Sequence, residues 1–273
     1  MRIHRLSLGL SLAGTALLTV SAFAAPATLP DPTAAQIDDI IQKFAAKEAE
    51  FAQARDNYTY KQTARIQELD DAGNVTGRWE TESDIAFTDD GKRTEHVTRS
   101  PVPSLHNILL TPEDLEDLRS VQPFVLTTNE LSKYWIRYLG RQNVDEIGTY
   151  VFAVKPKKME GTQRYFEGEV WVDDRDLQIV KSYGRGVGTA NKKENNQFPK
   201  FETYREQIDG KYWFPTYTIA NDTLHFKELD QRIRQTVKYE DYKQFKSQTT
   251  IRFGDAVDDK KDDTKGGNPP KKP

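Results

Sequence analysis

An alternation of period two runs through most of this chain, and it is clearest between Tyr165 and Lys181. In the first arm, YFEGEVWVD, one set of side chains is Phe166, Gly168, Val170 and Val172, and the opposite set is Tyr165, Glu167, Glu169 and Trp171. Such alternation is typical of a strand with one buried face and one wet face. The acidic turn at 173–176 and the second arm, in which Leu177 and Ile179 alternate with a polar residue, complete a predicted β-hairpin.

The same pattern predicts roughly ten to twelve strands, joined by turns rich in Asp, Asn and Gly. The expected strands are 58–69, 75–88, 92–98, 131–141, 149–157, 165–173, 177–185, 198–208, 211–220, 223–228, 231–242 and a short one at 249–253. Short connections between successive strands favour an antiparallel meander. The chain therefore reads as a largely β protein with few helices.

Two helices interrupt the strands. The first is expected over 33–54, where Asp31-Pro32 gives a cap and a proline at the helix start. An apolar stripe follows at helical spacing, formed by Ile37, Ile40, Ile41, Phe44, Ala45 and Phe51. The second is a short acidic helix over 111–120, for which Thr111 is a suitable cap. Both are expected to pack against the sheet.

The ends of the chain differ from its middle. Residues 1–24 combine two arginines, a short apolar run and Ala22-Phe23-Ala24, which is the pattern of a cleaved signal peptide. We therefore expect one domain over 25–253, exported to the periplasm as a soluble protein with no membrane span after cleavage. Residues 254–273 contain five Asp and five Lys and end in GGNPPKKP, so they have little to bury and a disordered tail is expected.

No motif in the chain predicts a reaction, a metal site or a cofactor. The histidines are scattered, there is no cysteine, and the glycines of 184–188 lack the following helix that a phosphate-binding loop needs. The acidic turn at 173–176 does not continue into a calcium loop, and no GxSxG elbow occurs. A net charge of −3 with mixed signs excludes a typical nucleic-acid-binding surface. We expect no enzyme and assign no catalytic residue.

Aromatic and apolar side chains recur on nearly every expected strand. They suit the core of a curved sheet, and a curved sheet with few helices often leaves a space for a ligand. The expected ligand-contacting residues are Ile37, Ile41, Phe44, Trp79, Phe87, Trp135, Phe152, Val170 and Trp213. On this interpretation Val170 faces the helices and Trp171 faces the other side, toward water.

The order of elements resembles a known family. A helix precedes a long meander, a helical insertion follows the third strand, and then come GEVWVD at 168–173 and LQIVK at 177–181. Later come WFPT at 213–216 and VKYEDY at 237–242. These features resemble the lipoprotein-carrier (LolA-type) superfamily, which includes outer-membrane lipoprotein-sorting proteins. The resemblance implies an α+β fold: an unclosed, strongly curved antiparallel half-barrel with the N-terminal helix and the inserted helix on its concave face.

The resemblance also implies a non-enzymatic periplasmic carrier that binds a lipid or an acylated protein and meets envelope proteins of the inner and outer membranes. The chain departs from the carriers in its charged middle strands and its short, acidic insertion. Two alternatives stay open: an envelope sensor or scaffold module that binds a protein partner, and a periplasmic hydrolase. A cavity filled by side chains would favour the sensor, and a buried pair of titratable groups with shifted pKa would favour the hydrolase.

Overall fold

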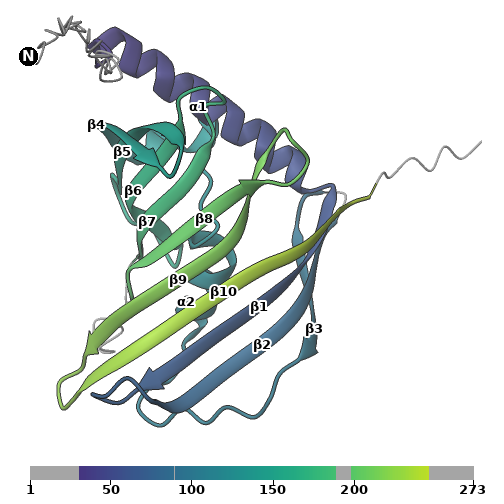
Figure 1. Cartoon of the computed structure of the whole chain (residues 1–273), viewed down its shortest axis with the longest axis vertical. Coiled ribbons are helices and arrows are strands. Elements are labelled where there is room, and N and C mark those ends of the chain that lie inside the picture. The colour runs from purple at the N-terminus through teal and green to yellow at the C-terminus, as the bar shows by residue number, and fades with distance from the viewer. Residues whose placement is uncertain (1–30, 89, 189–197, 246–273) are drawn as a thin grey trace, which may run out of the picture.

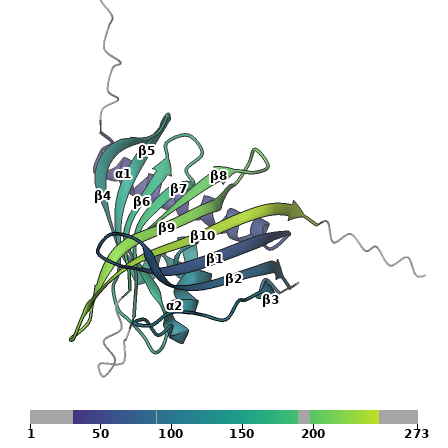
Figure 2. The same cartoon turned by 60° about the horizontal axis from the view of Figure 1, so that its bottom comes forward.

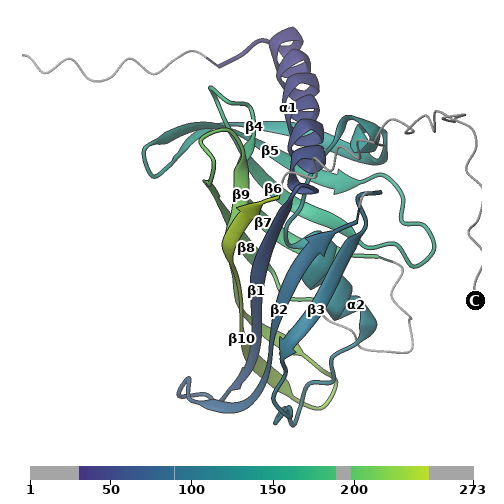
Figure 3. The ribbon, with the colours of Figure 1, turned by 90° about the vertical axis from the view of Figure 1, so that its right-hand side faces the viewer.

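The computed structural model describes residues 31–88, 90–188 and 198–245. In this part of the chain, ten strands form one antiparallel sheet in the order β3-β2-β1-β10-β9-β8-β7-β6-β5-β4. The two end strands, β3 and β4, do not pair with each other, so the sheet stays open (Figure 1). The sheet curves strongly, and Figure 3 shows α2 in its hollow. The expected open half-barrel is confirmed.

The strands match most of the predicted ranges. They are β1 (Tyr58–Leu69), β2 (Val75–Phe87), β3 (Arg93–Arg99), β4 (Tyr134–Val144), β5 (Ile147–Pro156), β6 (Tyr165–Asp173), β7 (Ile179–Val187), β8 (Phe201–Gln207), β9 (Trp213–His225) and β10 (Asp230–Gln244). The helical elements are α1 (Ala34–Arg55), α2 (Pro112–Glu116), a π-helical turn (Asp117–Val121) and a 3₁₀ turn (Thr128–Lys133).

One strand prediction is wrong. The expected strands at 211–220 and 223–228 are a single strand, β9, that runs without a break through Asn221-Asp222. Its partner β10 continues opposite these two polar residues, with Asp222 facing Ile233, and Arg234 donates a hydrogen bond to the Asn221 side chain at 3.2 Å. Tertiary pairing thus overrides the turn propensity of the Asn-Asp pair. The signal peptide, the strand at 249–253 and the charged tail lie outside the described residues.

The sheet consists of two meanders joined by its last strand. Strands β1–β3 follow one another, as do β4–β9, and β10 lies between β1 and β9 and pairs with both. In register, Val237 of β10 lies opposite Ala64 on one side and Thr218 on the other. Figure 2 shows β10 in the middle of the sheet.

Helix α1 begins with a complete capping box: the Gln36 backbone N–H donates to the Thr33 hydroxyl oxygen, and the Thr33 backbone N–H donates to the Gln36 side-chain oxygen. The predicted apolar stripe faces the concave side of the sheet. Phe44 and Phe51 are fully buried, with Phe44 5.4 Å from the ring of Phe152 and Phe51 edge-on to Phe214 at 5.2 Å. The predicted range is therefore confirmed to within one residue at each end, but the predicted cap is wrong: Thr33 caps the helix, and Asp31 and Pro32 precede it.

The hairpin of β6 and β7 has the predicted faces. Val170 is fully buried in the main core cluster beneath α1, whereas Trp171 packs on the opposite side of the sheet with Val151 and Val180. The expectation that the Trp171 face is wet is wrong, because this side chain is also buried. The Lys181 ammonium lies 5.0 Å from its ring centre, so a charged side chain helps to cover the tryptophan.

Candidate ligand-binding site

A long connection crosses the hollow of the sheet between β3 and β4. Its part over residues 100–127, which we call the crossing segment, contains α2 and the π-helical turn. Leu118 of this segment packs against Ala64, Ile85 and Val237 on the concave face. The segment therefore lies within the site and divides the space above the sheet.

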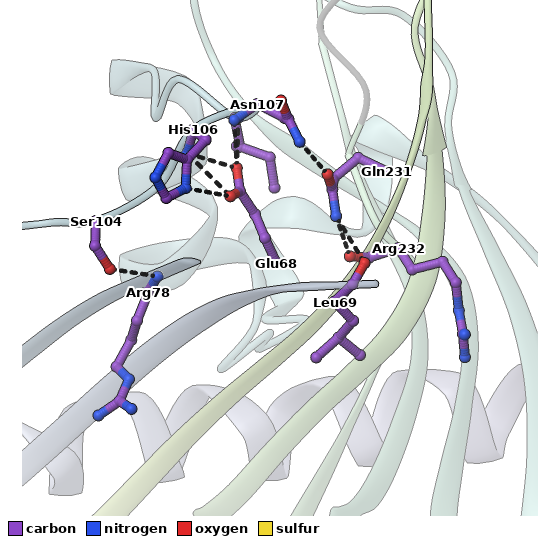
Figure 4. A network of polar contacts seen from close by, with 9 residues as sticks. Glu68, Leu69, Arg78, Ser104, His106, Asn107, Gln231 and Arg232 are labelled. Carbon is purple, nitrogen blue, oxygen red and sulfur yellow. Dashed lines mark hydrogen bonds and ion pairs between the residues drawn. The ribbon is translucent and has the colours of Figure 1, made fainter. Parts of the chain in front are cut away.

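The start of the crossing segment is fixed by one buried carboxylate. Glu68 of β1 is fully buried and accepts hydrogen bonds from the backbone amides of His106, Asn107 and Ile108 at 2.7–3.1 Å. Figure 4 shows the carboxylate directed at these amides, with Gln231 linking the Asn107 side chain to the sheet. Three convergent amides compensate the desolvation of the charge, so Glu68 pins the segment to the strand.

The middle of the segment is fixed by an ion pair. Asp117, in the π-helical turn, accepts two hydrogen bonds from the Arg164 guanidinium, at 2.7 and 2.6 Å. Both side chains are almost fully buried, and burial raises the pKa of Asp117 to about 6 against the opposing effect of Arg164. Gly186 of β7 leaves the room for this carboxylate, because a Cβ there would collide with it.

A second buried ion pair joins α1 to the end of the segment. Glu48 lies in the apolar stripe of α1, is fully buried, and accepts two hydrogen bonds from Arg205 of β8 at 3.1 Å and one from the Ile179 amide at 2.9 Å. Arg205 also donates to the Phe124 carbonyl. Burial raises the pKa of Glu48, and the charge of Arg205 opposes this.

Two cavities lie on either side of the crossing segment. The first, which we call the apolar cavity, has a volume of about 540 Å³ and lies between residues 107–112, residues 198–201 and strands β1, β9 and β10. Most of its lining is apolar, including Ile66, Ile108, Leu110, Phe198, Phe201, Leu224, Phe226 and Ile233. Both its size and its lining suit a small apolar ligand.

The second, the polar cavity, is larger, at about 1160 Å³, and lies between the end of α1, strands β1–β3 and residues 116–127. Its floor is aromatic, with Tyr60, Phe87 and Tyr239, but charged side chains such as Arg93 and Glu95 also line it. Arg93 and Glu95 are bonded to each other at 2.9 Å. Desolvation of these charges makes this cavity less suited to a purely apolar ligand.

The structure does not gather the nine expected ligand contacts around one space. Ile37, Ile41, Phe44, Phe152 and Val170 pack together in the main core between α1 and the sheet. Trp79 packs at the second cluster, beneath the crossing segment, and Phe87 lines the polar cavity. Trp135 is 67 % exposed, and Trp213 packs with Trp171 on the other side of the sheet. Ligand contact by these residues stays a prediction.

The sequence analysis did not identify the buried polar residues that shape the site, for different reasons. Glu48 stands three residues before Phe51 and four after Phe44, so a charge inside the apolar stripe was a usable signal. Arg205 likewise follows Phe201 and Thr203 on the buried face of its strand. Residues 107–112 are mostly irregular and show no periodicity, and the short acidic helix predicted over 111–120 gave no sign that Asp117 is buried.

The buried carboxylates of Asp117 and Glu48 are both engaged in structural contacts. Asp117 is taken up by Arg164, and Glu48 by Arg205 and a backbone amide. Among the residues that the structure describes, no group of three or more His, Asp or Glu side chains is placed to hold a metal ion. In the same ranges, no helix has both the length and the apolarity needed to cross a membrane. The candidate site is thus the apolar cavity beside the crossing segment, which Glu68 and the Asp117–Arg164 ion pair hold in place.

The fold and the geometry of the site can be set beside those of known proteins. No protein-family model and no curated protein sequence matches the chain significantly. Several solved structures do match the chain. A LolA superfamily protein from Nitrosomonas europaea is 14 % identical, with a TM-score of 0.38, over 75 % of this chain and 93 % of the other.

Two further structures are similar. A DUF1329 family protein from Desulfovibrio piger is 16 % identical, with a TM-score of 0.40, over 75 % of this chain and 92 % of that one. An outer membrane lipoprotein-sorting protein domain from Vibrio parahaemolyticus is 11 % identical, with a TM-score of 0.35, over 78 % and 96 %. At these identities the likeness concerns the fold alone.

Proposed function

We propose that this protein is a non-enzymatic binding or carrier protein of the bacterial periplasm, and that it takes a hydrophobic ligand into the apolar cavity. The observation that carries the proposal is that cavity itself, about 540 Å³ on the concave side of the sheet and lined mainly by apolar side chains. Its volume lies in the range of about 300–1,000 Å³ that ligand sites occupy.

The energetics are sufficient for useful affinity. Each methylene buried in the cavity contributes about 0.8 kcal/mol. A chain of about ten methylenes therefore gains about 8 kcal/mol, before the cost of immobilising it. A free lipid or the acyl group of a lipidated protein supplies such a chain. The signal peptide predicted over residues 1–24 supports an envelope location for either source.

Binding of Nile red, an uncharged apolar dye, tests the proposal. We expect micromolar binding by the parent protein and loss of binding in Leu224→Trp, because Leu224 lines the apolar cavity and a larger side chain fills it. Ile208→Trp is the matched control, since Ile208 is 40 % exposed and lines neither the apolar nor the polar cavity. Native mass spectrometry of protein from its own envelope identifies the bound lipid.

The result that contradicts a carrier function is a parent protein that binds no probe and copurifies with no lipid. A partner-binding module is then the better interpretation, and one observation favours it. Edge strand β4 exposes Trp135, with the Lys157 ammonium 5.0 Å from its ring centre, and Leu139 of the same strand is also exposed. An unpaired edge with exposed apolar side chains is a typical docking surface for another chain.

A further inference from the structure

Strand β4 ends the sheet on the side opposite β3, and its outer side pairs with no other described strand (Figure 1). Its concave side is fixed to the body of the protein, because Tyr134 is buried in the main core cluster and Ile136 and Tyr138 pack against that cluster. The pairing with β5 is regular from Tyr134 to Tyr138 and shifts before Gly140. Residues 134–138 therefore form a rigid open edge about as long as an ordinary strand.

Two side chains of this edge point away from the core, on the convex side of the sheet. Trp135 is 67 % exposed and Arg137 is also exposed, so the two alternate with the core-facing residues. Lys155 of β5 lies opposite Trp135 in register, and the Lys157 ammonium lies 5.0 Å from the centre of the Trp135 ring. The edge therefore presents one large apolar side chain among three cations.

The charges of this edge are only partly balanced within the protein. Strands β4 and β5 contain no Asp or Glu. Lys155 reaches across to Glu167 of β6 at 3.4 Å, but Arg137 has no hydrogen bond or ion pair among the described residues. A positive charge thus stays available beside the open backbone of β4.

The opposite edge of the sheet shows the ordinary arrangement. Both arginines of β3 are paired, Arg93 with Glu95 at 2.9 Å and Arg99 with Glu80 and Glu82. The same residue type is therefore neutralised at one edge and left available at the other. An open edge with an unpaired cation fits an added strand that brings an acidic side chain.

From these observations we propose that β4 docks an extended acidic segment of a protein partner, which adds to the sheet beside residues 134–138. The backbone of the segment pairs with the free side of β4. Its side chains at alternate positions, one apolar and one acidic, meet Trp135 and Arg137. Neither of these two residues lines the apolar or the polar cavity, so the inference goes beyond the proposed function and does not depend on it.

Other occupants fit this edge less well. A second copy of the chain, pairing through its own β4, would bring no acid to meet Arg137, because neither β4 nor β5 contains one. An anionic membrane surface would suit the cations, but it has no strand to pair with the backbone of the open edge. An acidic peptide strand supplies both the backbone groups and the charge.

Titration of isotope-labelled protein with short peptides, followed by NMR, tests the inference. The heptapeptide Ac-TVTETVT-NH2 presents Val and Glu two positions apart in either orientation, and Ac-TVTKTVT-NH2 is its charge-reversed control. A third peptide repeats the acidic sequence with N-methyl groups on two successive central residues, so it loses a backbone donor on each side. We expect the acidic peptide to shift the amide signals of residues 134–138. It should bind about fivefold or more tightly than either control.

Charge reversal at Arg137 locates the site. Arg137→Glu should remain folded, since this side chain is exposed and unpaired, and it should reverse the preference so that the lysine peptide binds more tightly. Arg234→Glu is the matched control, because Arg234 is exposed on β10 in the middle of the sheet, where no backbone edge is free. It should keep the preference of the parent protein. Nile red binding should be unchanged in both variants, so failure at this edge is separate from failure of the proposed function.

The outcomes decide which occupant takes the edge. The inference is overturned if the acidic peptide binds no better than the lysine peptide, or if Arg137→Glu leaves the preference unchanged. Equally tight binding of the N-methylated peptide would exclude strand addition. Binding to phosphatidylglycerol vesicles that Arg137→Glu abolishes, without peptide binding, would assign the edge to an anionic membrane instead. Self-association with concentration-dependent shifts of residues 134–138 would assign it to a second copy of the chain.

Discussion

Replacing Glu48 by glutamine tests how α1 is held on the sheet. The carboxylate accepts two hydrogen bonds from Arg205 and one from the Ile179 amide, and no part of Glu48 is exposed. Glutamine keeps the shape and one acceptor but removes the charge. The guanidinium of Arg205, whose side chain is 2 % exposed, then stays buried without its counter-ion.

The expected loss of stability is large. Removing one partner of a buried ion pair costs about 3–5 kcal/mol, because the other charge is left uncompensated. A domain has about 5–15 kcal/mol of stability in total, so Glu48→Gln removes a substantial fraction of it. For a domain of about 200 residues, each kcal/mol corresponds to about 2–4 °C, which places the expected decrease in melting temperature at about 10 °C.

Urea unfolding followed by tryptophan fluorescence measures this loss. The control is Glu50→Gln on the same helix, because Glu50 is paired with Lys47 at 2.9 Å but is 49 % exposed, and such surface pairs contribute about 1 kcal/mol or less. The double variant Glu48→Met, Arg205→Met should recover part of the loss, since both charges are then removed. Equal effects of Glu48→Gln and Glu50→Gln would refute the reasoning.

Three further predictions follow from packing and burial. Val170→Asp should destabilise more than Trp171→Asp in urea melts, because Val170 lies in the main core beneath α1; equal losses would show that both faces are equally covered. Burial raises the pKa of Asp117 to about 6, so its contribution is present below about pH 4 and is lost as pH rises through 6. The melting temperature of the parent relative to Asp117→Asn should therefore fall by several degrees from pH 4 to 6.5. Gly186→Ala should destabilise by displacing Asp117 from Arg164, and a hydrogen-exchange map should show the loosening around residues 112–121; an unchanged map would contradict this.

Much of the fold could be predicted from the sequence because its signals are local. The alternation in β6 and the stripe of α1 each reflect one buried face, and both appear as predicted. The predicted break between 211–220 and 223–228 was wrong because β10 pairs with β9 through these residues, and local sequence does not show that pairing. Propensity at Asn221-Asp222 is outweighed by that pairing.

The candidate site was less predictable. Its walls come from residues 107–112 and 198–201, which are irregular, and from single positions on β1, β9 and β10 that meet only in the folded protein. The predicted ligand contacts were chosen as large apolar side chains, and Phe44 and Phe152 instead fill the core against each other. The cavity lies beside the part of the crossing segment that Glu68 ties to β1, and no local pattern in the sequence marks that contact.

The position of β10 has a consequence for how the chain acquires its fold. Tyr58 at the start of β1 pairs with Gln244 at the end of β10, so the first and last of the described strands must pair across almost the whole domain. Pairings of such high sequence separation form slowly. Until β10 is in place, β1 and β9 are both open edges that can join strands of other molecules. The sheet is therefore complete only once β10 is available, and a chain cut short before residue 230 leaves the β1–β3 and β4–β9 meanders separate, each with an exposed edge.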